Sequence, residues 1–378
     1  MRRRHNAMTM YDELGLRRVI NAKATMTPLG GSLMPREVLE AMVDAAGSFV
    51  DVGQLQKAVG ERIAALTHNE AAYVANSCAA GLALAAAACA TGTDIPKIYR
   101  VPDLTGMPDE IAIHNSHRFV FDNSFRLAGF TLREFGLSHV TTEWQLEAAL
   151  SERTAAIAYV VAPHLTGKGY LPLQTVVNIA RARGIPVIVD AAAQLPPVSN
   201  LWHFTREVGA DLAIFSGGKD LRGPQSSGLI VGRKDLIEAI TLHGSPNIAL
   251  GRPMKVGKEE LVGLYAAVRR YVALDHDALG RLYEQRVVTM IGALDGASHL
   301  HACRDWPNEA GQPAPRALVR FAPPLSRDAI VAALQDEDPP IAVHLAGDDG
   351  ILLNPMTLED GEDLIVARRV RAAAALPV

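Results

Sequence analysis

The sequence predicts an α/β protein with a mainly parallel sheet covered by helices, followed by a smaller α+β domain. From about residue 70, short Val-, Ile- and Ala-rich runs alternate with helical segments. These runs are apolar on both faces, as is typical of parallel strands buried between helices. The 378 residues also exceed what one core comfortably holds. We therefore expect an N-terminal arm (1–30), a large domain (31–250), and an interdomain helix with a small C-terminal domain (251–378).

The strands of the large domain are predicted at the apolar runs, and the helices between them. The alanine-rich segment 79–92 follows the first strand, and the helix over 173–184 ends in the glycine that is typical of a helix-to-strand connection. In chain order, the predicted strands are 71–76, 110–115, 155–162, 185–193, 211–218 and 227–233, and a further helix is predicted around 123–130.

The alternation stops around residues 243–260, and a different pattern follows. One long helix is predicted over residues 259–279, leading away from the sheet. From about residue 285 strands and helices mix, which indicates the smaller α+β domain. The predicted strands there are 316–321 and 350–355, and the predicted helices are 327–335 and 359–374.

Composition excludes several classes of function. The net charge of −4 provides no general attraction for nucleic acid. We see no apolar run long enough to span a bilayer, and no apolar stretch after the basic N-terminus that would predict a signal peptide. Cys78, Cys89 and Cys303 form no CxxC pair, which favours a reducing, cytoplasmic compartment and argues against structural zinc.

Three features fall where predicted strands end. Asp190 ends one strand, Lys219 follows another, and the small-residue turn 76–81 joins a strand to a helix. Ligands bind at the carboxyl ends of strands in an open parallel sheet, and a helix N-terminus favours an anion. Each feature also has an ordinary explanation, as a helix-capping acid, a solvated lysine or a packing turn.

Together, the three features predict a site for pyridoxal 5'-phosphate. This cofactor needs a lysine for its Schiff base, an acid to keep its ring nitrogen protonated, and an anchor for its phosphate. Lys219 must be partly desolvated to act as a nucleophilic amine near neutral pH, and its glycine neighbours fit such a closed site.

The same motifs carry a family resemblance. NAKATMTPLGG, QLQKAVGERIAALTHNEAAYV, VIVDAAAQLPP and SGGKDLRGPQSSGLIVGR resemble the SelA-like branch of the fold-type I pyridoxal-phosphate enzymes. That branch includes L-seryl-tRNA(Sec) selenium transferases and D-glucosaminate-6-phosphate ammonia-lyase-type proteins. The resemblance runs from about residue 10 to the C-terminus, and it implies a sheet of the seven-stranded type and a homodimer or larger homo-oligomer.

The resemblance also implies roles for residues around the cofactor ring. Lys219 would form the Schiff base and act as general base, and Asp190 would pair with the pyridine nitrogen. Ala192 would pack on one face of the ring, and His117 would stack on the other, although a histidine there could equally be a capping residue. Gln194 would reach the phenolic oxygen.

Further residues are expected around the phosphate and the substrate. The phosphate contacts implied by the resemblance are Ser77, Cys78, Ala79 and Ser216. Arg222, Gln225 and Ser226 lie in a loop that either contacts phosphate or substrate across a dimer or is simply a turn. Arg252 and Lys255 would meet an anionic substrate, or else are plain solvated cations.

The sequence departs from the family pattern in two places, and it predicts no metal site. Ser77 stands where the family usually has glycine. Lys23 and Ala24 replace the usual residues of an NARGT arm, which leaves the arm's substrate contacts open. His114, His164 and His203 show no HxxxH or His/Cys spacing, so no metal site is expected.

The expected reaction is α,β-elimination of water from a β-hydroxy amino acid or amino sugar acid, with release of ammonia and a 2-keto acid. Racemase, aldolase or aminotransferase activity is the alternative for a substrate without a leaving group. Selenium transfer to seryl-tRNA is disfavoured, because the arm begins only about twenty residues in and leaves no room for a tRNA-recognition domain. A non-catalytic paralogue is also disfavoured, since it would not need Lys219.

Overall fold

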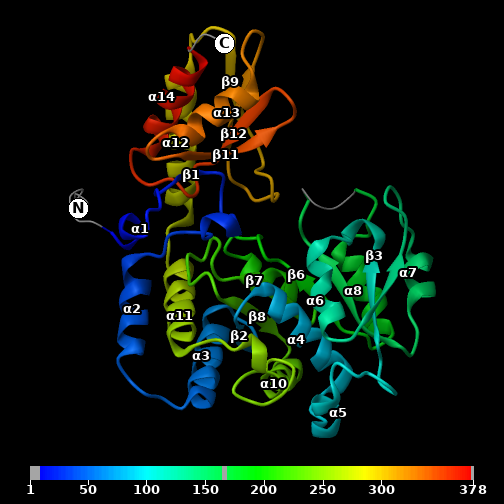
Figure 1. Ribbon diagram of the computed structural model, residues 1–378. Coiled ribbons are helices and arrows are strands. Elements are labelled where there is room, and N and C mark those ends of the chain that lie inside the picture. The colour runs from blue at the N-terminus through cyan, green and yellow to red at the C-terminus, as the bar shows by residue number, and fades with distance from the viewer. Residues whose placement is uncertain (1–8, 164–167, 376–378) are drawn as a thin grey trace. The chain divides into compact units, whose positions relative to one another are not determined.

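The computed structural model describes residues 9–163 and 168–375, and the chain forms two compact units (Figure 1). The larger unit contains residues 32–274 together with the short segment 309–312. The smaller unit contains the preceding N-terminal residues, 275–308, and the chain from residue 313 onward.

A seven-stranded sheet forms the centre of the larger unit, in the order β2-β8-β7-β6-β5-β3-β4. The five neighbours from β7 to β4 pair in parallel, and β8 runs antiparallel to both β7 and β2. This confirms the mainly parallel sheet predicted from the sequence. The strands are β2 (Ala71–Ala75), β3 (Glu110–His114), β4 (Thr131–Phe135), β5 (Thr154–Val160), β6 (Val187–Asp190), β7 (Leu212–Ser216) and β8 (Gly228–Gly232).

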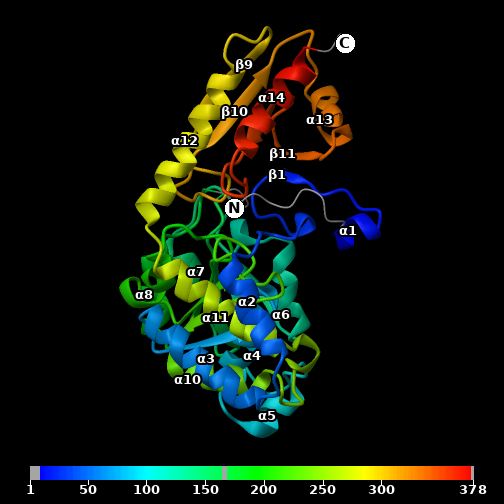
Figure 2. The same cartoon turned by 90° about the vertical axis from the view of Figure 1, so that its left-hand side faces the viewer.

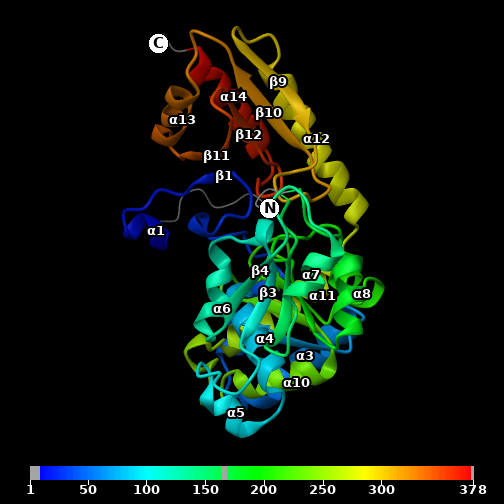
Figure 3. The ribbon, with the colours of Figure 1, turned by 90° about the vertical axis from the view of Figure 1, so that its right-hand side faces the viewer.

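Strand β4 is the one strand of this sheet that we did not predict. It lies at the sheet edge beside β3 (Figure 3). Arg133 and Glu134 are exposed there and only Phe135 is buried, so the strand lacks the apolar run that marks the central strands.

Helices cover both faces of the sheet. The helices of the larger unit are α2 (Arg36–Ala46), α3 (Val52–Leu66), α4 (Cys78–Thr91), α5 (Ile95–Arg100), α6 (Asn123–Leu127), α7 (Glu143–Ala149), α8 (Leu173–Ala182), α9 (Asn200–Trp202), α10 (Lys234–His243) and α11 (Lys258–Val272). One face packs against α3, α7, α8 and α11, and the other against α4, α6 and α10. On the outside, α2 lies beside α11 (Figure 2).

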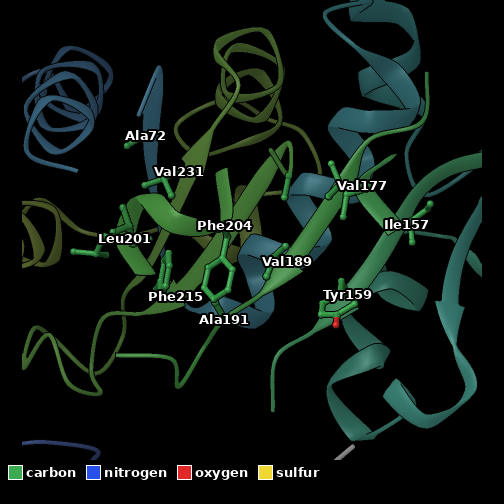
Figure 4. Close-up of a cluster of buried hydrophobic side chains, with 14 of the residues drawn as sticks. Ala72, Ile157, Tyr159, Val177, Val189, Ala191, Leu201, Phe204, Phe215 and Val231 are labelled. Carbon is green, nitrogen blue, oxygen red and sulfur yellow. The ribbon is translucent and has the colours of Figure 1, made fainter. Parts of the chain in front are cut away.

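Alternation along the strands builds the two cores. In β5, Ile157 and Tyr159 face one core, whereas Ala156 and Ala158 face the other. Figure 4 shows the first of these cores, where Phe204 and Phe215 pack near Val189. Because both faces are covered, every residue of β5 is buried, which explains why its sequence after Thr154 is apolar.

Helix α4 is buried on nearly all sides, which accounts for its alanine-rich sequence. Its position against the sheet is so close that a Cβ atom at Gly81 would lie 2.9 Å from a methyl carbon of Ile214. A helix that is apolar all round belongs in a core, and small side chains let its backbone approach the strands. This packing fixes the N-terminal end of α4 at the carboxyl edge of the sheet.

The long helix predicted over residues 259–279 is wrong, because the chain forms two helices there. Helix α11 ends at Val272, and α12 (His276–Leu294) begins after Asp275. The Asp275 carboxylate accepts the N–H of Ala278 at 2.8 Å and so caps a new helix. Helix α11 belongs to the larger unit and α12 to the smaller one.

The smaller unit contains a five-stranded sheet in the order β1-β11-β12-β10-β9, in which β1 and β11 are parallel and the other pairs are antiparallel. Helices α12 and α14 pack against each other, as Figure 2 shows. Besides α12, the elements of the smaller unit are α1 (Met10–Glu13), β1 (Ile20–Ala22), β9 (Leu300–Asp305), β10 (Arg316–Phe321), α13 (Arg327–Asp336), β11 (Ile341–Ala346), β12 (Gly350–Leu353) and α14 (Glu362–Ala374).

Within the described part of the chain, no helix combines the length and the apolar character that a membrane span requires.

Candidate active site

The predicted cofactor residues come from three neighbouring elements of the larger unit. Asp190 is the last residue of β6, and Ser216 is the last residue of β7, with Lys219 three residues further on. These two strands are adjacent and parallel, so their carboxyl ends lie at the same edge of the sheet. Ser77 caps α4, whose first residue, Cys78, contacts Asp190. The structure therefore brings Cys78, Asp190 and Lys219 into one region.

Asp190 is anchored through one of its two carboxylate oxygens. Oδ1 accepts the N–H of Ala192 at 3.1 Å, and Sγ of Cys78 lies 3.6 Å from the same oxygen. Asp190 is only 8% exposed. Burial raises the pKa of its carboxyl group, whereas the Ala192 N–H, the charge of Lys219 and the Cys78 thiol act in the opposite direction. A cationic partner at Oδ2 would favour the ionised form further.

The N-terminal end of α4 has the features of an anion site. The Ser77 hydroxyl accepts the N–H of Ala80 at 3.0 Å, and the first backbone bond of the helix joins the Gly81 N–H to the Ser77 carbonyl. The N–H groups of Cys78 and Ala79 precede that bond, so they lie at the positive end of the helix dipole. This is the arrangement that binds phosphate groups.

Gly228 of β8 allows this turn to pack against the sheet. A Cβ atom at that position would lie 2.6 Å from the backbone nitrogen of Cys78 and closer still to the Ser77 backbone. Real Cβ atoms do not approach backbone atoms so closely. Glycine is therefore required for the close contact that holds the first turn of α4 in place.

The two glycines before Lys219 also allow close packing, in the loop that carries Lys219. A Cβ at Gly217 would clash with the Ser227 hydroxyl, and one at Gly218 would lie 2.7 Å from Cα of Gln225. The Gly218 carbonyl also accepts a hydrogen bond from the Ser32 hydroxyl at 2.9 Å. The loop thus folds tightly onto itself and leaves Lys219 half-buried at the end of β7.

His117 is fully buried beside two tyrosines. Its ring centroid lies 4.8 Å from those of Tyr159 and Tyr170, and its Nδ1 accepts the N–H of Val160 at 3.3 Å. Nε2 has no hydrogen-bond partner among the residues that the structure describes. Burial, followed by the neighbouring His114, lowers the pKa of His117 to about 3, so the ring is neutral. Stacking of His117 on a cofactor stays a prediction.

The loop after β6 is fastened by a distant segment that the sequence did not reveal. The Gln194 side-chain nitrogen donates to the Ala310 carbonyl at 2.9 Å. The Gln312 side-chain nitrogen donates to the Leu195 carbonyl and to Oδ2 of Asp220, the latter at 3.0 Å. No local motif marks this pairing, because segment 309–312 lies far from both loops in the sequence. We call residues 309–312 the strap.

The residues predicted to bind substrate lie on two segments of the larger unit. Arg222 has a left-handed backbone with φ of 55°, and its Nε donates to the Leu33 carbonyl at 2.7 Å. Gln225 and Ser226 are exposed on the same loop.

Arg252 and Lys255 are exposed on the segment after α10. Their neighbour Gly251 packs against Leu84, which is more than one helical turn along α4 from Cys78. Contact of these two cations with a substrate anion stays a prediction.

Two of the three histidines considered for a metal site, His114 and His203, bond to other side chains. His114 bonds to Thr141 and Ser116, and Nδ1 of His203 lies 2.7 Å from a carboxylate oxygen of Glu207. Across residues 9–163 and 168–375, no group of three or more His, Cys, Asp or Glu side chains could hold a metal ion. His164 lies outside the described residues.

Comparison with known proteins supports the same interpretation. Residues 19–291 match the family described as "SelA: L-seryl-tRNA selenium transferase". The chain is 33% identical to D-glucosaminate-6-phosphate ammonia lyase of Salmonella typhimurium (strain 14028s / SGSC 2262), covering 97% of this chain and 98% of that protein. It is 37% identical to the 5'-C-glycyluridine monooxygenase-decarboxylase of a Streptomyces species, covering 85% of this chain and 80% of that protein.

A solved structure of D-glucosaminate-6-phosphate ammonia-lyase superposes with a TM-score of 0.85 at 32% identity, covering 97% of this chain and 98% of that one. The cofactor of this fold and family is pyridoxal 5'-phosphate. The site fits it, because it provides a lysine, a buried carboxylate with one oxygen anchored, and the N-terminal end of a helix. The protein is a member of the SelA family of fold-type I pyridoxal-phosphate enzymes.

Proposed function

We propose that this protein is a pyridoxal-phosphate-dependent ammonia lyase that acts on a β-hydroxy amino acid or an amino sugar acid. It eliminates water, and hydrolysis of the product of that elimination then releases ammonia and a 2-keto acid. The observation that carries this proposal is the 33% identity to D-glucosaminate-6-phosphate ammonia lyase over almost the whole length of both chains. The substrate is accordingly a small molecule.

Two residues carry the chemistry. Pyridoxal 5'-phosphate, when bound, withdraws electrons from the substrate and makes its α-proton acidic. The Lys219 amine would hold the cofactor covalently and would take the α-proton of the substrate as general base. Asp190 would pair with the ring nitrogen through Oδ2, since its Oδ1 is already held by the N–H of Ala192. The ion pair keeps the ring nitrogen protonated.

Other residues hold the cofactor. The N–H groups of Cys78 and Ala79 bind the phosphate at the end of α4 that Ser77 caps, and the Ser216 hydroxyl adds a further contact. Ala192 and His117 enclose the ring, and the neutral His117 offers its buried Nε2 to a partner. Gln194 uses one N–H to fasten its loop to Ala310, and its contact with the phenolic oxygen remains a proposal.

The substrate site and the assembly are proposed together. Arg222, Gln225 and Ser226 contact the cofactor phosphate or the substrate across a homodimer or larger homo-oligomer, and Arg252 and Lys255 receive an anionic group of the substrate. The three cysteines are free thiols, which fits a cytoplasmic location. Light scattering of the purified holoenzyme tests the assembly, and a monomer that retains full activity would contradict it.

A second candidate is oxidative decarboxylation of a glycine-like amino acid. The 37% identity to 5'-C-glycyluridine monooxygenase-decarboxylase, over 85% of this chain, favours it. The two reactions differ in one reactant and one product. A monooxygenase consumes dioxygen and a decarboxylase releases carbon dioxide, whereas the ammonia-lyase reaction neither consumes dioxygen nor releases carbon dioxide.

The experiment that tests the proposal is a substrate panel assayed with and without dioxygen. Purified holoenzyme is given D- and L-β-hydroxy amino acids, amino sugar acids with and without phosphate, and a glycyl nucleoside. We expect ammonia and a 2-keto acid in equal amounts from an amino acid with a β-hydroxyl, at the same rate under nitrogen. Product formed only in air, together with carbon dioxide, would instead identify the second candidate.

The covalent attachment is tested separately. Borohydride treatment of the holoenzyme followed by peptide mass mapping should find the reduced cofactor on Lys219. The Lys219→Ala variant should carry no adduct and should lose activity by several orders of magnitude, because it lacks both the attachment point and the base. An adduct on another lysine would overturn the assigned roles.

A further inference from the structure

The side chain of Cys78 contacts the carboxylate of Asp190, which is 112 residues further along the chain. Sγ lies 3.6 Å from Asp190 Oδ1 and 3.8 Å from the carbonyl oxygen of Ile214. That carbonyl already accepts the N–H of Ala191 at 2.9 Å. A thiol has one hydrogen and a carboxylate is the stronger acceptor, so the Cys78 S–H donates to Asp190.

Cys78 stays a hydrogen-bond donor in this environment. Burial raises the pKa of its thiol well above the ordinary value, and the negative charge of Asp190 acts in the same direction, against the smaller effect of Lys219. The thiol therefore keeps its proton at neutral pH. Its contact with Asp190 is a hydrogen bond to a carboxylate and not a repulsion between two anions.

Two donors from different elements fix the same oxygen of Asp190. The N–H of Ala192 approaches Oδ1 from the loop after β6, and Cys78 approaches it from the first turn of α4. We infer that the Cys78 side chain is a positioning residue for Asp190, holding Oδ1 so that Oδ2 faces the ring nitrogen of the cofactor. This inference rests on the proposed pairing of Asp190 with that nitrogen.

Cys78 thereby links the two ends of the cofactor site. Its backbone N–H lies at the end of α4 proposed to bind phosphate, whereas its side chain holds the carboxylate at the other end. One residue thus contributes to both anchors. Substitutions at this position remove the side-chain contact but leave the backbone N–H in place, so the two roles can be measured apart.

The test measures how tightly the apoprotein binds pyridoxal 5'-phosphate, by absorbance titration, without any activity assay. Cys78→Ala and Cys78→Val, which lack the donor, should weaken binding about three- to tenfold, as expected for loss of one hydrogen bond. Cys78→Ser keeps a donor and should stay within about twofold of wild type, since a hydroxyl replaces the thiol as donor. Cys89→Ala is the matched control, because Cys89 is a second free cysteine of α4 and lies eleven residues from Cys78; it should bind like wild type.

A double-mutant cycle shows whether Cys78 acts through Asp190. In the Asp190→Asn background, Cys78→Ala should cause no further loss of cofactor affinity. An equal loss in both backgrounds, or no loss in wild type from either Cys78→Ala or Cys78→Val, would overturn the inference while leaving the proposed function intact. If Asp190→Asn alone bound the cofactor as tightly as wild type, the proposed pairing itself would fail. Circular dichroism of each apoprotein verifies folding.

Discussion

The side-chain nitrogen of Gln312 lies 3.0 Å from Oδ2 of Asp220, the residue after Lys219. This hydrogen bond joins two residues that are 92 positions apart in the sequence. Gln312 is only 4% exposed, and it also donates to the Leu195 carbonyl in the loop after β6. The strap thus holds together the loop that follows Asp190 and the loop that carries Lys219. Asp220 is a buried ionisable group at this junction, close enough to Lys219 and Glu309 to feel their charges.

Asp220 should make the stability of the apoprotein depend on pH. Burial raises the pKa of its carboxyl group from the ordinary 3.8 to about 7. Between these values the folded chain keeps a proton that the unfolded chain has lost, so the free energy of unfolding falls as the pH rises through this interval. Asp220→Asn removes the titration. Urea unfolding of both proteins at a series of pH values should show the wild type losing stability relative to the variant between pH 3.8 and about 7.

Above that interval the difference between the two proteins should become constant. In the Asp220→Asn variant, the amide carbonyl oxygen can still accept the hydrogen bond from Gln312, so the comparison isolates the charge. A difference that is independent of pH, or one that grows as the pH rises in favour of the wild type, would contradict the assignment.

His243 should produce a pH dependence of the opposite sign. Its Nε2 lies 2.8 Å from the Thr91 hydroxyl in a fully buried contact, and burial lowers its pKa from 6.5 to about 4. The folded state therefore resists a proton that the unfolded chain accepts, and stability is lost as the pH falls from 6.5 towards 4. His243→Gln retains a polar partner for Thr91 and should not show this loss. Thermal unfolding of both apoproteins at pH 4.5, 5.5 and 7.0, values chosen to span this titration, measures it.

The residues of the candidate site that could be predicted from the sequence are those that end buried strands. Asp190 and Lys219 follow runs that are apolar throughout, and such runs identify parallel strands whose carboxyl ends share one edge. The turn at Ser77 could be predicted for a similar reason, because it follows a buried strand and its small residues begin an apolar helix. For these positions, local sequence and topology indicate the same site.

The contacts that could not be predicted join residues far apart in the chain. The thiol of Cys78 reaches Asp190, and Gln312 reaches Asp220, through packing that no local pattern encodes. The break before α12 was missed for a different reason. The helical periodicity continues on both sides of Asp275, and only the capping hydrogen bond shows where one helix ends and the next begins.

Gly228 offers a direct test of the packing that places the first turn of α4. A Cβ there would lie 2.6 Å from the Cys78 nitrogen and still closer to Ser77, and backbone atoms on both sides prevent an easy adjustment. Gly228→Ala should lower the free energy of unfolding by about 1–3 kcal/mol through overpacking. It should also weaken cofactor binding, because the displaced turn carries the N–H groups proposed to hold the phosphate.

Gly280 in α12 provides the matched control. A Cβ at this helical position would meet no atom within 4 Å. Gly280→Ala should therefore raise the free energy of unfolding by about 0.5–1 kcal/mol, since alanine favours the helix more than glycine does. Cofactor affinity should not change, because the added Cβ meets no other atom and Gly280 is not among the proposed cofactor residues. Denaturant unfolding and cofactor titration of both variants separate the effects. If Gly228→Ala bound the cofactor like Gly280→Ala, the close contact between β8 and α4 would have no part in forming the phosphate site.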